Sequence, residues 1–511
     1  MASRTENSFR NIKFALVSQV GTLLIGFVTR SVFVRMLSTD YLGVNGLFSS
    51  ILMILSLAEL GVGAALTYHM YEPLAKDDQA KIVTLMEIFR KSYTIITCII
   101  LLVGLSITPF IYSFINEAPD VSNLRLIYVL FVINSASAYV FAHKMSLISA
   151  DQKDYIVSAY RFVFTMVLNI LQIIFLILTR NYVIFISLQI GTNLIRNTFL
   201  AWQTDKLYPY LKTVKGRKLT LAETRDISQK IRAMMLHKIG GVFVVGTDNI
   251  ILARLVNLTV VGLYSNYTLV LSGVQLVIGM VFRSISASIG NLGATSTKDA
   301  LTTNFRTINF LGFWIHSVVT VCLFVLFNPF ITVWLGAEFA LPKYVVAAIV
   351  LNFYLNGMRT SVLTFKDTLG LFYQDRYKPF FEAIVNIVFS IALGIRFGAV
   401  GVFIGTAIST ITVCLWVEPY VLYKHGLNDK LRSYFGAYLK YGMGTLITVV
   451  ILSLLFDRLP ISNLIFFFLA GALCFIVTNL FLYLIYGRTQ EFKDLFVKAS
   501  SALKLDRFLK R

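Results

Sequence analysis

The stretch NIKFALVSQVGTLLIGFVTRSVFVRML, residues 11–37, is long and apolar enough to cross a bilayer as a helix, yet it contains Arg30 and Arg35. Arg254 occupies the matching place in a second apolar run, residues 231–256. A guanidinium at membrane depth is costly, so such residues usually face a watery cavity or a charged partner. A guanidinium is also well shaped to hold phosphate through paired hydrogen bonds. This pattern predicts a transporter with an anionic substrate.

The composition is that of a polytopic membrane protein. Of the 511 residues, 57% are apolar and 14% are charged, and the mean hydropathy is +0.74. A soluble protein of this size needs a more polar surface. We attribute the net charge of +20 to cytoplasmic loops and expect no nucleic-acid partner, because the basic residues are scattered among many apolar runs. The four cysteines lack metal-ligand spacing, so we expect neither a metal site nor a cofactor.

Apolar runs of about 20 residues or more predict fourteen membrane-spanning helices. We therefore predict an all-α fold in which two parallel six-helix repeats form an N-lobe and a C-lobe around a central cavity, followed by two C-terminal helices. The predicted parts are the N-lobe (1–215), the C-lobe with its preceding basic linker (216–430), the last two spans (431–487) and a basic cytoplasmic tail (488–511). The predicted spans are 12–36, 44–70, 88–113, 122–146, 155–179, 182–203, 231–256, 260–285, 305–335, 344–365, 379–397, 399–423, 436–456 and 462–486.

The distribution of Lys and Arg predicts the orientation. Most of the 46 basic residues fall on one side if the N-terminus is inside, so we expect both termini to be cytoplasmic and the protein to lie in the cell membrane. Two sets of matches predict the internal repeat. A shift of 219 residues sets Gly21 on Gly240, Arg35 on Arg254 and Gly43 on Gly262, and Gln152-x-x-Tyr155 matches Gln374-x-x-Tyr377.

One side of the first span is polar at helical spacing. This predicts a helix that lines a cavity, although small and hydroxyl residues also gather at helix–helix seams. Arg30 favours the cavity, since a seam does not need a charge. The polar side consists of Ser18, Gln19, Thr22, Gly26, Thr29 and Arg30. The predicted residues that bind the anionic substrate are Arg30, Arg35, Arg254, Thr22, Gln19 and Asn249.

Two acidic residues are predicted to act in charge pairing or ion coupling. Glu59 lies within the second span and Asp248 within the seventh. Each is either the structural partner of an arginine or a proton or cation site. Arg35 and Arg254 lie near span ends, where snorkelling to the interface is the alternative to binding. We interpret five further charged residues as interface anchors: Arg90, Arg161, Arg196, Glu382 and Glu418.

Several motifs of other protein classes are absent from the sequence. No GxxxxGK[ST], HExxH, CxxC or GxSxG occurs, and the loops are too short for a catalytic domain. We therefore expect a transporter and not an enzyme. One alternative is a cation-coupled multidrug exporter, although an arginine-lined cavity would repel cationic drugs. The other is a membrane polysaccharide polymerase or ligase, which we would expect to carry a large outward loop.

Residues 11–66, NIKFALVSQVGTLLIGFVTRSVFVRMLSTDYLGVNGLFSSILMILSLAELGVGAAL, resemble the start of the bacterial polysaccharide transporters. These include the O-antigen and capsule flippases of the multidrug/oligosaccharidyl-lipid/polysaccharide (MOP) superfamily. The matching features are the first span ending in arginines, Tyr41-Leu42-Gly43 in the following turn, and Glu59-Leu60-Gly61 in the second span. The stretch DNIILARLVNLTVVGLYSNYTL, residues 248–269, also resembles the family.

The resemblance implies a flippase that carries undecaprenyl-pyrophosphate-linked oligosaccharide to the outer leaflet by alternating access. The products would be capsule, O-antigen-like polymer, teichoic acid or peptidoglycan precursor. In the related lipid II flippases, cavity arginines engage the pyrophosphate and two extra C-terminal helices form a groove for the lipid tail. Here these roles fall to Arg30, Arg35 and Arg254, and to residues 436–486. Many members have Asp where this chain has Glu59, which leaves its role open. The implied partners are H⁺ or Na⁺, a polysaccharide polymerase and glycosyltransferases.

Overall fold

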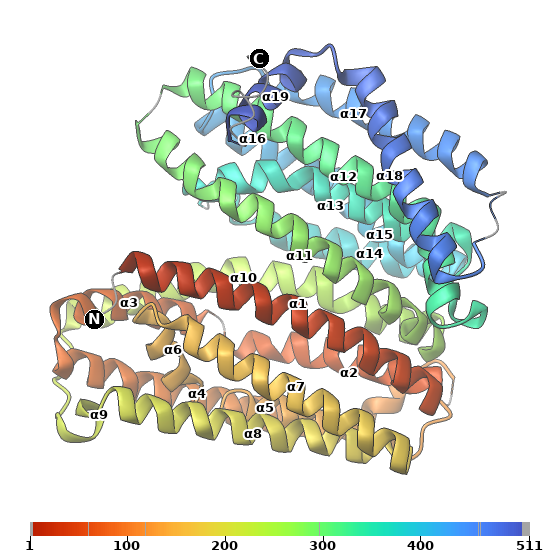
Figure 1. Ribbon diagram of the computed structural model, residues 1–511. Helices are drawn as coiled ribbons and strands as arrows, with labels where there is room; N and C mark the ends of the chain where they lie inside the picture. The colour runs from red at the N-terminus through yellow and green to blue at the C-terminus, as the bar shows by residue number, and fades with distance from the viewer. Residues whose placement is uncertain are drawn as a thin grey trace. The chain divides into compact units, whose positions relative to one another are not determined.

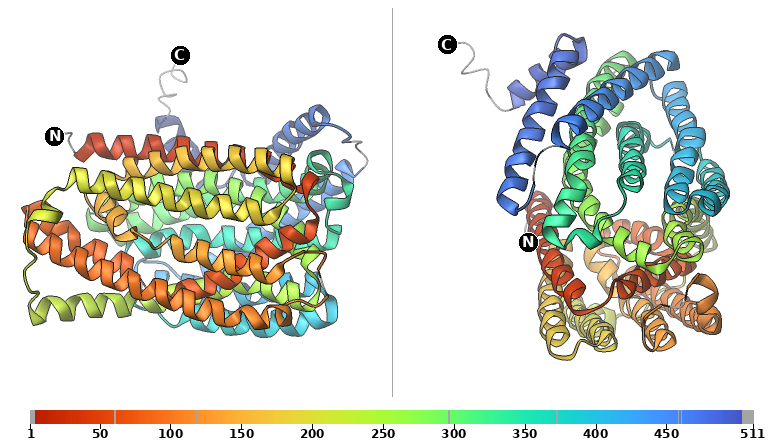
Figure 2. Two further views of the ribbon diagram at one scale, coloured as in Figure 1. Left: turned by 90° about the horizontal axis from the view of Figure 1, so that it is seen from below. Right: turned by 90° about the vertical axis from the view of Figure 1, so that its right-hand side faces the viewer.

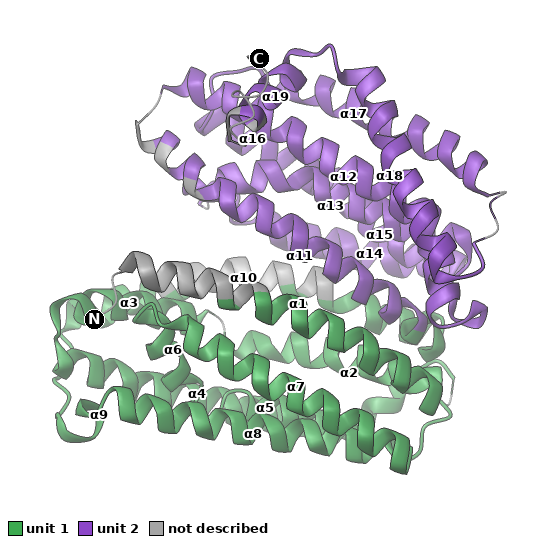
Figure 3. Cartoon of the chain, viewed as in Figure 1, with its two compact units in different colours: residues 1–262 green, residues 263–511 purple. Residues whose placement is uncertain are grey.

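The computed structural model describes residues 4–59, 61–117, 119–295, 297–371, 373–457, 459 and 461–502. Within these ranges the chain forms helices and no strand, which confirms the predicted all-α fold (Figure 1). The chain divides into two compact units, unit 1 (residues 1–262) and unit 2 (residues 263–511) (Figure 3). The end of the predicted basic tail, residues 503–511, lies outside the described residues.

Unit 1 contains the first ten α-helices and the start of the eleventh. Helices α1 and α7 pack side by side along much of their length (Figure 2). The elements are α1 (Arg4–Met36), α2 (Thr39–Leu55), the 3₁₀ helix η1 (Ser56–Glu59), α3 (Val62–Lys76), α4 (Gln79–Ile107), η2 (Thr108–Phe114), α5 (Leu124–Ser137), α6 (Ala142–Ala150), α7 (Asp154–Thr179), α8 (Tyr182–Leu207), α9 (Tyr210–Thr213), α10 (Leu221–Leu255) and α11 (Leu258–Thr295).

Unit 2 contains most of α11 and the remaining helices. Its elements are α12 (Lys298–Trp334), η3 (Ala337–Phe339), α13 (Lys343–Thr368), α14 (Lys378–Phe397), α15 (Ala399–Ser409), the π-helical turn η4 (Thr410–Cys414), α16 (Leu415–His425), α17 (Leu431–Phe456), α18 (Leu464–Tyr486) and α19 (Gln490–Ala502). An aromatic core joins α12 to α17 and α18. In it the rings of Phe313 and Tyr441 stack with centroids 4.1 Å apart, and Tyr486 packs edge-on against Phe313.

Thirteen helices in the described part of the chain are long and apolar enough to cross a bilayer. They correspond to thirteen of the fourteen predicted spans. The remaining predicted span, 231–256, lies in α10, and the side chains of its residues 232–241 and 243–245 are outside the described set. Large apolar side chains on α7 and α18 remain exposed, as Leu178 and Ile465 illustrate at 72% each. A helix that faces lipid needs no apolar cover, so these surfaces fit a multi-pass membrane protein.

The boundary between the units differs from the predicted boundary between the lobes. Helix α10 belongs to unit 1 because it packs against α2 and α3. The boundary between the units therefore falls between residues 262 and 263 of the chain, whereas the sequence places the start of the C-lobe at residue 216. Units group helices by packing and lobes group them by repeat, so the lobe boundaries stay a prediction.

The polar segment between α8 and α10 is fixed to the first turns of α4. The hydroxyl of Thr84 donates a hydrogen bond to the carbonyl of Arg217 at 2.6 Å. The carboxylate of Glu223 accepts hydrogen bonds from Arg217 at 2.7 and 3.1 Å and lies 3.0 Å from the ammonium of Lys81. Thr220 and Glu223 also form a capping box that begins α10. The linker therefore has a defined path over unit 1.

Candidate functional site

The polar side of α1 is partly a seam and partly open. The Thr29 hydroxyl donates to the Asn169 amide oxygen of α7 at 2.6 Å, and Gly21 lies close to the Phe162 ring of the same helix. This edge is the helix–helix seam that the sequence left as an alternative. Further round the helix, Thr22 is exposed, Gln19 is half-buried, and a Cβ at Gly26 would meet nothing within 4 Å.

Arg30 lies beside Gln19 on the open edge at helical spacing, away from Gly21 and the seam. It is half-buried and lies near Tyr182 at the start of α8. Tyr182 is 2% exposed and its ring packs edge-on against Phe33 at 5.6 Å. Among the described residues its hydroxyl has no hydrogen-bond partner. A buried, unsatisfied hydroxyl is costly, so this position is suited to an added polar group beside the guanidinium.

The other predicted binding residues have more exposed surroundings. Arg35 and Arg254 are exposed in the last turns of α1 and α10, and neither makes an ion pair with any described residue. Asn249 donates its amide to the Ser50 hydroxyl at 3.0 Å, which ties α10 to α2. Asp248 is half-buried beside it. The binding roles of these residues stay predictions.

Glu59 lies at a break in the second predicted span. The span divides into α2, η1 and α3, with Gly61 in the left-handed conformation at φ 76°. The Tyr93 hydroxyl of α4 donates to Glu59 Oε1 at 3.4 Å. A Cβ at Gly63 would collide with that hydroxyl and would lie 2.9 Å from Glu59 Oε1. The chain therefore bends at Gly61 and packs closely at Gly63, and the half-buried carboxylate of Glu59 lies where the helix is interrupted.

A second broken helix lies next to the first. The fourth predicted span divides into α5 and α6, and Phe141 between them has a left-handed backbone at φ 62°. Tyr139, in the break, packs on Tyr93 with ring centroids 5.9 Å apart. The buried amide of Asn197 on α8 donates to the Ser137 carbonyl at 3.1 Å, which satisfies one of the backbone groups that the break exposes. Interrupted helices at membrane depth are typical of substrate and ion sites in transporters.

Sequence reasoning missed most of this arrangement. Tyr93, Tyr139 and Asn197 are polar residues inside apolar runs, which was the available signal. These three residues lie together only because two helices break near them. Phe141 does not predict a break, because a residue other than glycine rarely adopts a left-handed backbone. Arg196, interpreted as an interface anchor, is half-buried and donates to the Asn197 side chain at 3.2 Å.

Residues related by the predicted repeat contact each other at one end of unit 1. Asp40 Oδ1 accepts a hydrogen bond from the Thr259 hydroxyl at 2.7 Å, and these two residues are 219 positions apart. A Cβ at Gly43 would collide with the Leu258 carbonyl, and one at Gly262 with the Thr39 carbonyl. We call this contact the glycine seam. It requires glycine at both positions, which explains why the repeat keeps Gly43 and Gly262.

The interpretation of Glu382 and Glu418 as interface anchors is wrong. Their side chains are 9% and 0% exposed and they form ion pairs inside unit 2. The sequence places both near span ends, but packing by α13 and α16 covers them. Their contacts are described below.

A groove lies between α17 and α18, the two helices that follow the predicted repeats. Its volume is about 640 Å³. The helices approach closely at Gly444, where a Cβ would collide with the Tyr486 hydroxyl, and that hydroxyl donates to the Lys440 carbonyl at 2.7 Å. The lining is apolar apart from Lys440 and Tyr486, and it consists of Lys440, Met443, Gly444, Ile447, Phe481, Leu484, Ile485 and Tyr486.

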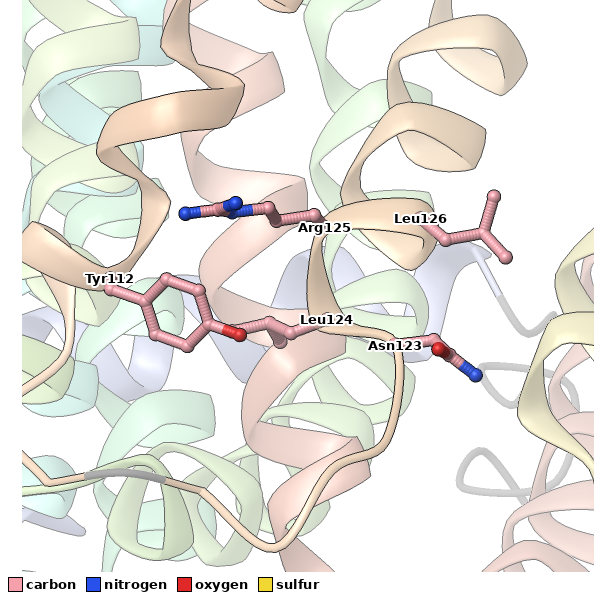
Figure 4. A pocket seen from close by; sticks show the side chains of 5 residues that line it. All are labelled: Tyr112, Asn123, Leu124, Arg125 and Leu126. Carbon is pink, nitrogen blue, oxygen red and sulfur yellow. The ribbon is translucent and has the colours of Figure 1, made fainter.

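A second hollow lies in unit 1 at the junction of η2 and α5. Its volume is about 510 Å³ and it is lined by Tyr112 and residues 123–126. The Arg125 guanidinium lies over the Tyr112 ring, 5.6 Å from its centroid, whereas Leu126 points away from the ring (Figure 4). Arg125 is exposed, so this is a shallow surface feature.

Comparisons with known proteins identify the family. The family model described as "Polysaccharide biosynthesis protein" matches residues 8–285, more than half of the chain. A comparison with curated protein sequences finds no match.

Three solved structures illustrate the fold. The lipid II flippase MurJ in an inward closed conformation matches with a TM-score of 0.63 and 15% identity over 92% of this chain and 99% of that one. An inward-facing multidrug resistance MATE family transporter gives 0.59 and 12% over 81% and 98%. The MATE transporter VcmN of Vibrio cholerae in its bent form gives 0.53 and 12% over 84% and 98%. The chain therefore belongs to the polysaccharide biosynthesis protein family and has the fold of the MOP superfamily transporters.

Proposed function

We propose that this protein is a flippase for undecaprenyl-pyrophosphate-linked oligosaccharide, which it moves from the inner to the outer leaflet of the cell membrane. The sugars and the pyrophosphate cannot cross hydrocarbon unaided, because burying unpaired charge is prohibitive. A transporter with alternating access removes this barrier by giving the head group a hydrated, cationic path. Family membership is the observation that carries the proposal, since the family is one of polysaccharide biosynthesis.

Arg30 is the best-supported residue for the pyrophosphate. It is half-buried, it borders the open edge of α1, and the neighbouring Tyr182 hydroxyl offers a second hydrogen-bonding group. A guanidinium binds two phosphate oxygens at once, and a phenol adds a third donor. Arg35 and Arg254 are proposed to guide the anionic head group from exposed positions.

The groove between α17 and α18 supports a lipid substrate. Its walls are apolar, and Lys440 is the one charged residue in its lining. A polyprenyl chain fits apolar walls, and an ammonium at the edge suits a phosphate at the end of that chain. The MurJ structure also covers a larger share of this chain than the two MATE structures do.

Glu59 and Asp248 are proposed to act in coupling or in charge balance, with H⁺ or Na⁺ as the ion. Glu59 supports this role through its place at the helix break beside Tyr93. The proposed orientation has both termini in the cytoplasm, which the distribution of basic residues supports. A polysaccharide polymerase and glycosyltransferases are the proposed functional partners.

Deleting the gene in its host tests the proposal. We expect a lipid-linked oligosaccharide to accumulate on the inner leaflet and the corresponding surface glycan to be lost, with both restored by the wild-type gene. Normal surface glycan and normal lipid-linked pools would contradict the proposal.

The MATE fold makes a multidrug exporter the alternative. Increased sensitivity to cationic drugs in the deletion strain, together with normal glycans, would favour it. Loss of organic-cation transport in Glu59→Gln with unaffected Arg30→Ala would favour it further.

A further inference from the structure

Four charged side chains are buried together inside unit 2. Arg359 belongs to α13, Lys378 and Glu382 to α14, and Glu418 to α16. Their side chains are 11%, 8%, 9% and 0% exposed, respectively. The set carries two positive and two negative charges and is neutral as a whole.

The four side chains form a closed ring of contacts. Arg359 donates through Nε and Nη2 to the two carboxylate oxygens of Glu418 at 2.9 and 2.6 Å. The Lys378 ammonium lies 2.7 Å from Glu418 and 2.7 Å from Glu382. Glu382 lies 3.6 Å from Arg359 Nη1, which closes the ring. Paired Arg–carboxylate contacts fix both distance and angle, so the ring holds three helices in one geometry.

A second ion pair fixes the loop that follows α13. The Lys366 ammonium contacts the Asp375 carboxylate, and both side chains are buried. Asp375 lies in the loop that leads to α14. This pair therefore ties the end of the loop that precedes α14 back to α13.

The corresponding span in unit 1 has the opposite character. Lys144 precedes Gln152 by the same interval at which Lys366 precedes Gln374, so α5 and α6 together correspond to α13. In unit 1 this span is interrupted between Ser137 and Ala142, whereas α13 runs unbroken from Lys343 to Thr368.

We propose that Arg359, Lys378, Glu382 and Glu418 form an ion-pair brace that keeps α13 continuous and joins it rigidly to α14 and α16. Bending in this span of the repeat is then confined to the break between α5 and α6 in unit 1. Buried charges are tolerated only when they are matched, so removing one member leaves an uncompensated charge and destabilises the other three. The inference concerns rigidity and does not depend on the transported substrate.

The test compares Glu418→Gln with Asp457→Asn as a matched control. Asp457 also forms an ion pair, with Lys343 at 2.7 Å, but both side chains are more than half exposed. We expect Glu418→Gln to speed amide hydrogen exchange in α13 by about tenfold or more and to lower the melting temperature in detergent by on the order of 10 °C. Asp457→Asn should change neither, because exposed pairs contribute little.

A paired variant keeps the test decisive if Glu418→Gln does not fold. Arg359→Gln combined with Glu418→Gln restores neutrality and leaves Lys378 matched with Glu382. We expect this double variant to recover most of the melting temperature. The brace is excluded if amide exchange in Glu418→Gln equals that of the wild type, or if exchange rises equally in α5 and α6. It is also excluded if the double variant loses as much melting temperature as the two single variants combined. None of these readouts uses transport, so failure of the brace and failure of the proposed function are distinguishable.

Discussion

Among the three predicted cationic residues, Arg30 alone has a partly buried environment. Its neighbour Tyr182 is buried and Arg35, one and a half turns along α1, is exposed. A half-buried guanidinium gains more from an anion than an exposed one, because less water competes and salt screens it less. We therefore expect Arg30 to contribute more to the free energy of head-group binding than Arg35 or Arg254 does.

Replacing Arg30 by Ala should reduce glycan export on the order of tenfold or more while the protein remains in the membrane. Arg30→Lys should restore export only in part, since an ammonium does not make the paired contact. Arg35→Ala is the matched control and should have a smaller effect. The measurement is surface glycan per molecule of membrane-inserted protein. Equal export by Arg30→Ala and wild type would contradict the assignment.

At the same scale, the sequence identifies charged residues but not their partners. Arg30 and Glu59 stand out because they interrupt apolar runs. Glu418 also lies in an apolar run, but its partner Arg359 is 59 positions away, and proximity over that distance depends on how α13 and α16 pack. The buried ring of charges was therefore beyond sequence reasoning, which singled out Glu382 and Glu418 but neither Arg359 nor Lys378.

Among the helices, the main difference between sequence and structure is that the second and fourth predicted spans are broken. The sequence predicts the spans because their length and apolarity are local properties. The bend at Gly61 occurs at a residue type suited to it, since glycine adopts positive φ without strain. The sequence does not predict the break before α6, because Phe141 adopts φ 62° only under tertiary constraint, with Asn197 holding the exposed carbonyls.

Substituting Gly61 by Ala should destabilise the protein by about 1–2 kcal/mol, because the left-handed conformation is strained for a residue with Cβ. Gly442→Ala on α17 is the control, since nothing lies within 4 Å of the added methyl and the backbone is helical. It should leave stability unchanged or raise it. Thermal unfolding in detergent provides the measurement. Equal melting temperatures would show that the break does not constrain Gly61.

The linker gives a pH-dependent prediction. Hydrogen bonds from Arg217, from the Thr220 amide and from Lys81 hold the pKa of Glu223 well below its usual value of 4.5. Because the folded pKa is the lower one, this contribution to stability is present above pH 4.5 and is lost as the pH falls further. Proteolysis of the segment 208–220 should therefore be faster at pH 4 than at pH 7, after correction for protease activity. Glu223→Gln should be cleaved rapidly at both values. A wild-type segment that is equally protected at both values, and as well protected in Glu223→Gln, would contradict this role.

At the scale of the whole molecule, the repeat is the organising feature. The sequence reveals it through rare matched residues, and the glycine seam shows that Gly43 and Gly262 are retained for a mutual close approach. The boundary between the two compact units is less accessible from sequence, because α10 packs with α2 and α3 while its repeat places it at the start of the second half. The proposed alternating access between the predicted lobes requires the predicted outer end of α2 to separate from the start of α11 during each cycle.

Cross-linking the glycine seam should therefore stop transport. In a background without the four native cysteines, Asp40→Cys and Thr259→Cys would be bridged by a short, reducible thiol reagent. We expect export to cease in the doubly substituted protein and to return after reduction, whereas each single variant stays active in the presence of the reagent. Undiminished export by the fully bridged protein would show that the seam stays closed throughout transport.

The central claim is that this chain itself moves a pyrophosphate-linked glycolipid across a bilayer. The direct measurement uses purified protein in liposomes that contain undecaprenyl-pyrophosphate-linked oligosaccharide, with a membrane-impermeant glycosidase reporting how fast the glycan reaches the opposite leaflet. We predict that the wild type accelerates this transfer over protein-free liposomes and that Arg30→Ala abolishes most of the acceleration. Transfer at the protein-free rate, under a proton gradient, a sodium gradient and a membrane potential alike, would contradict the claim.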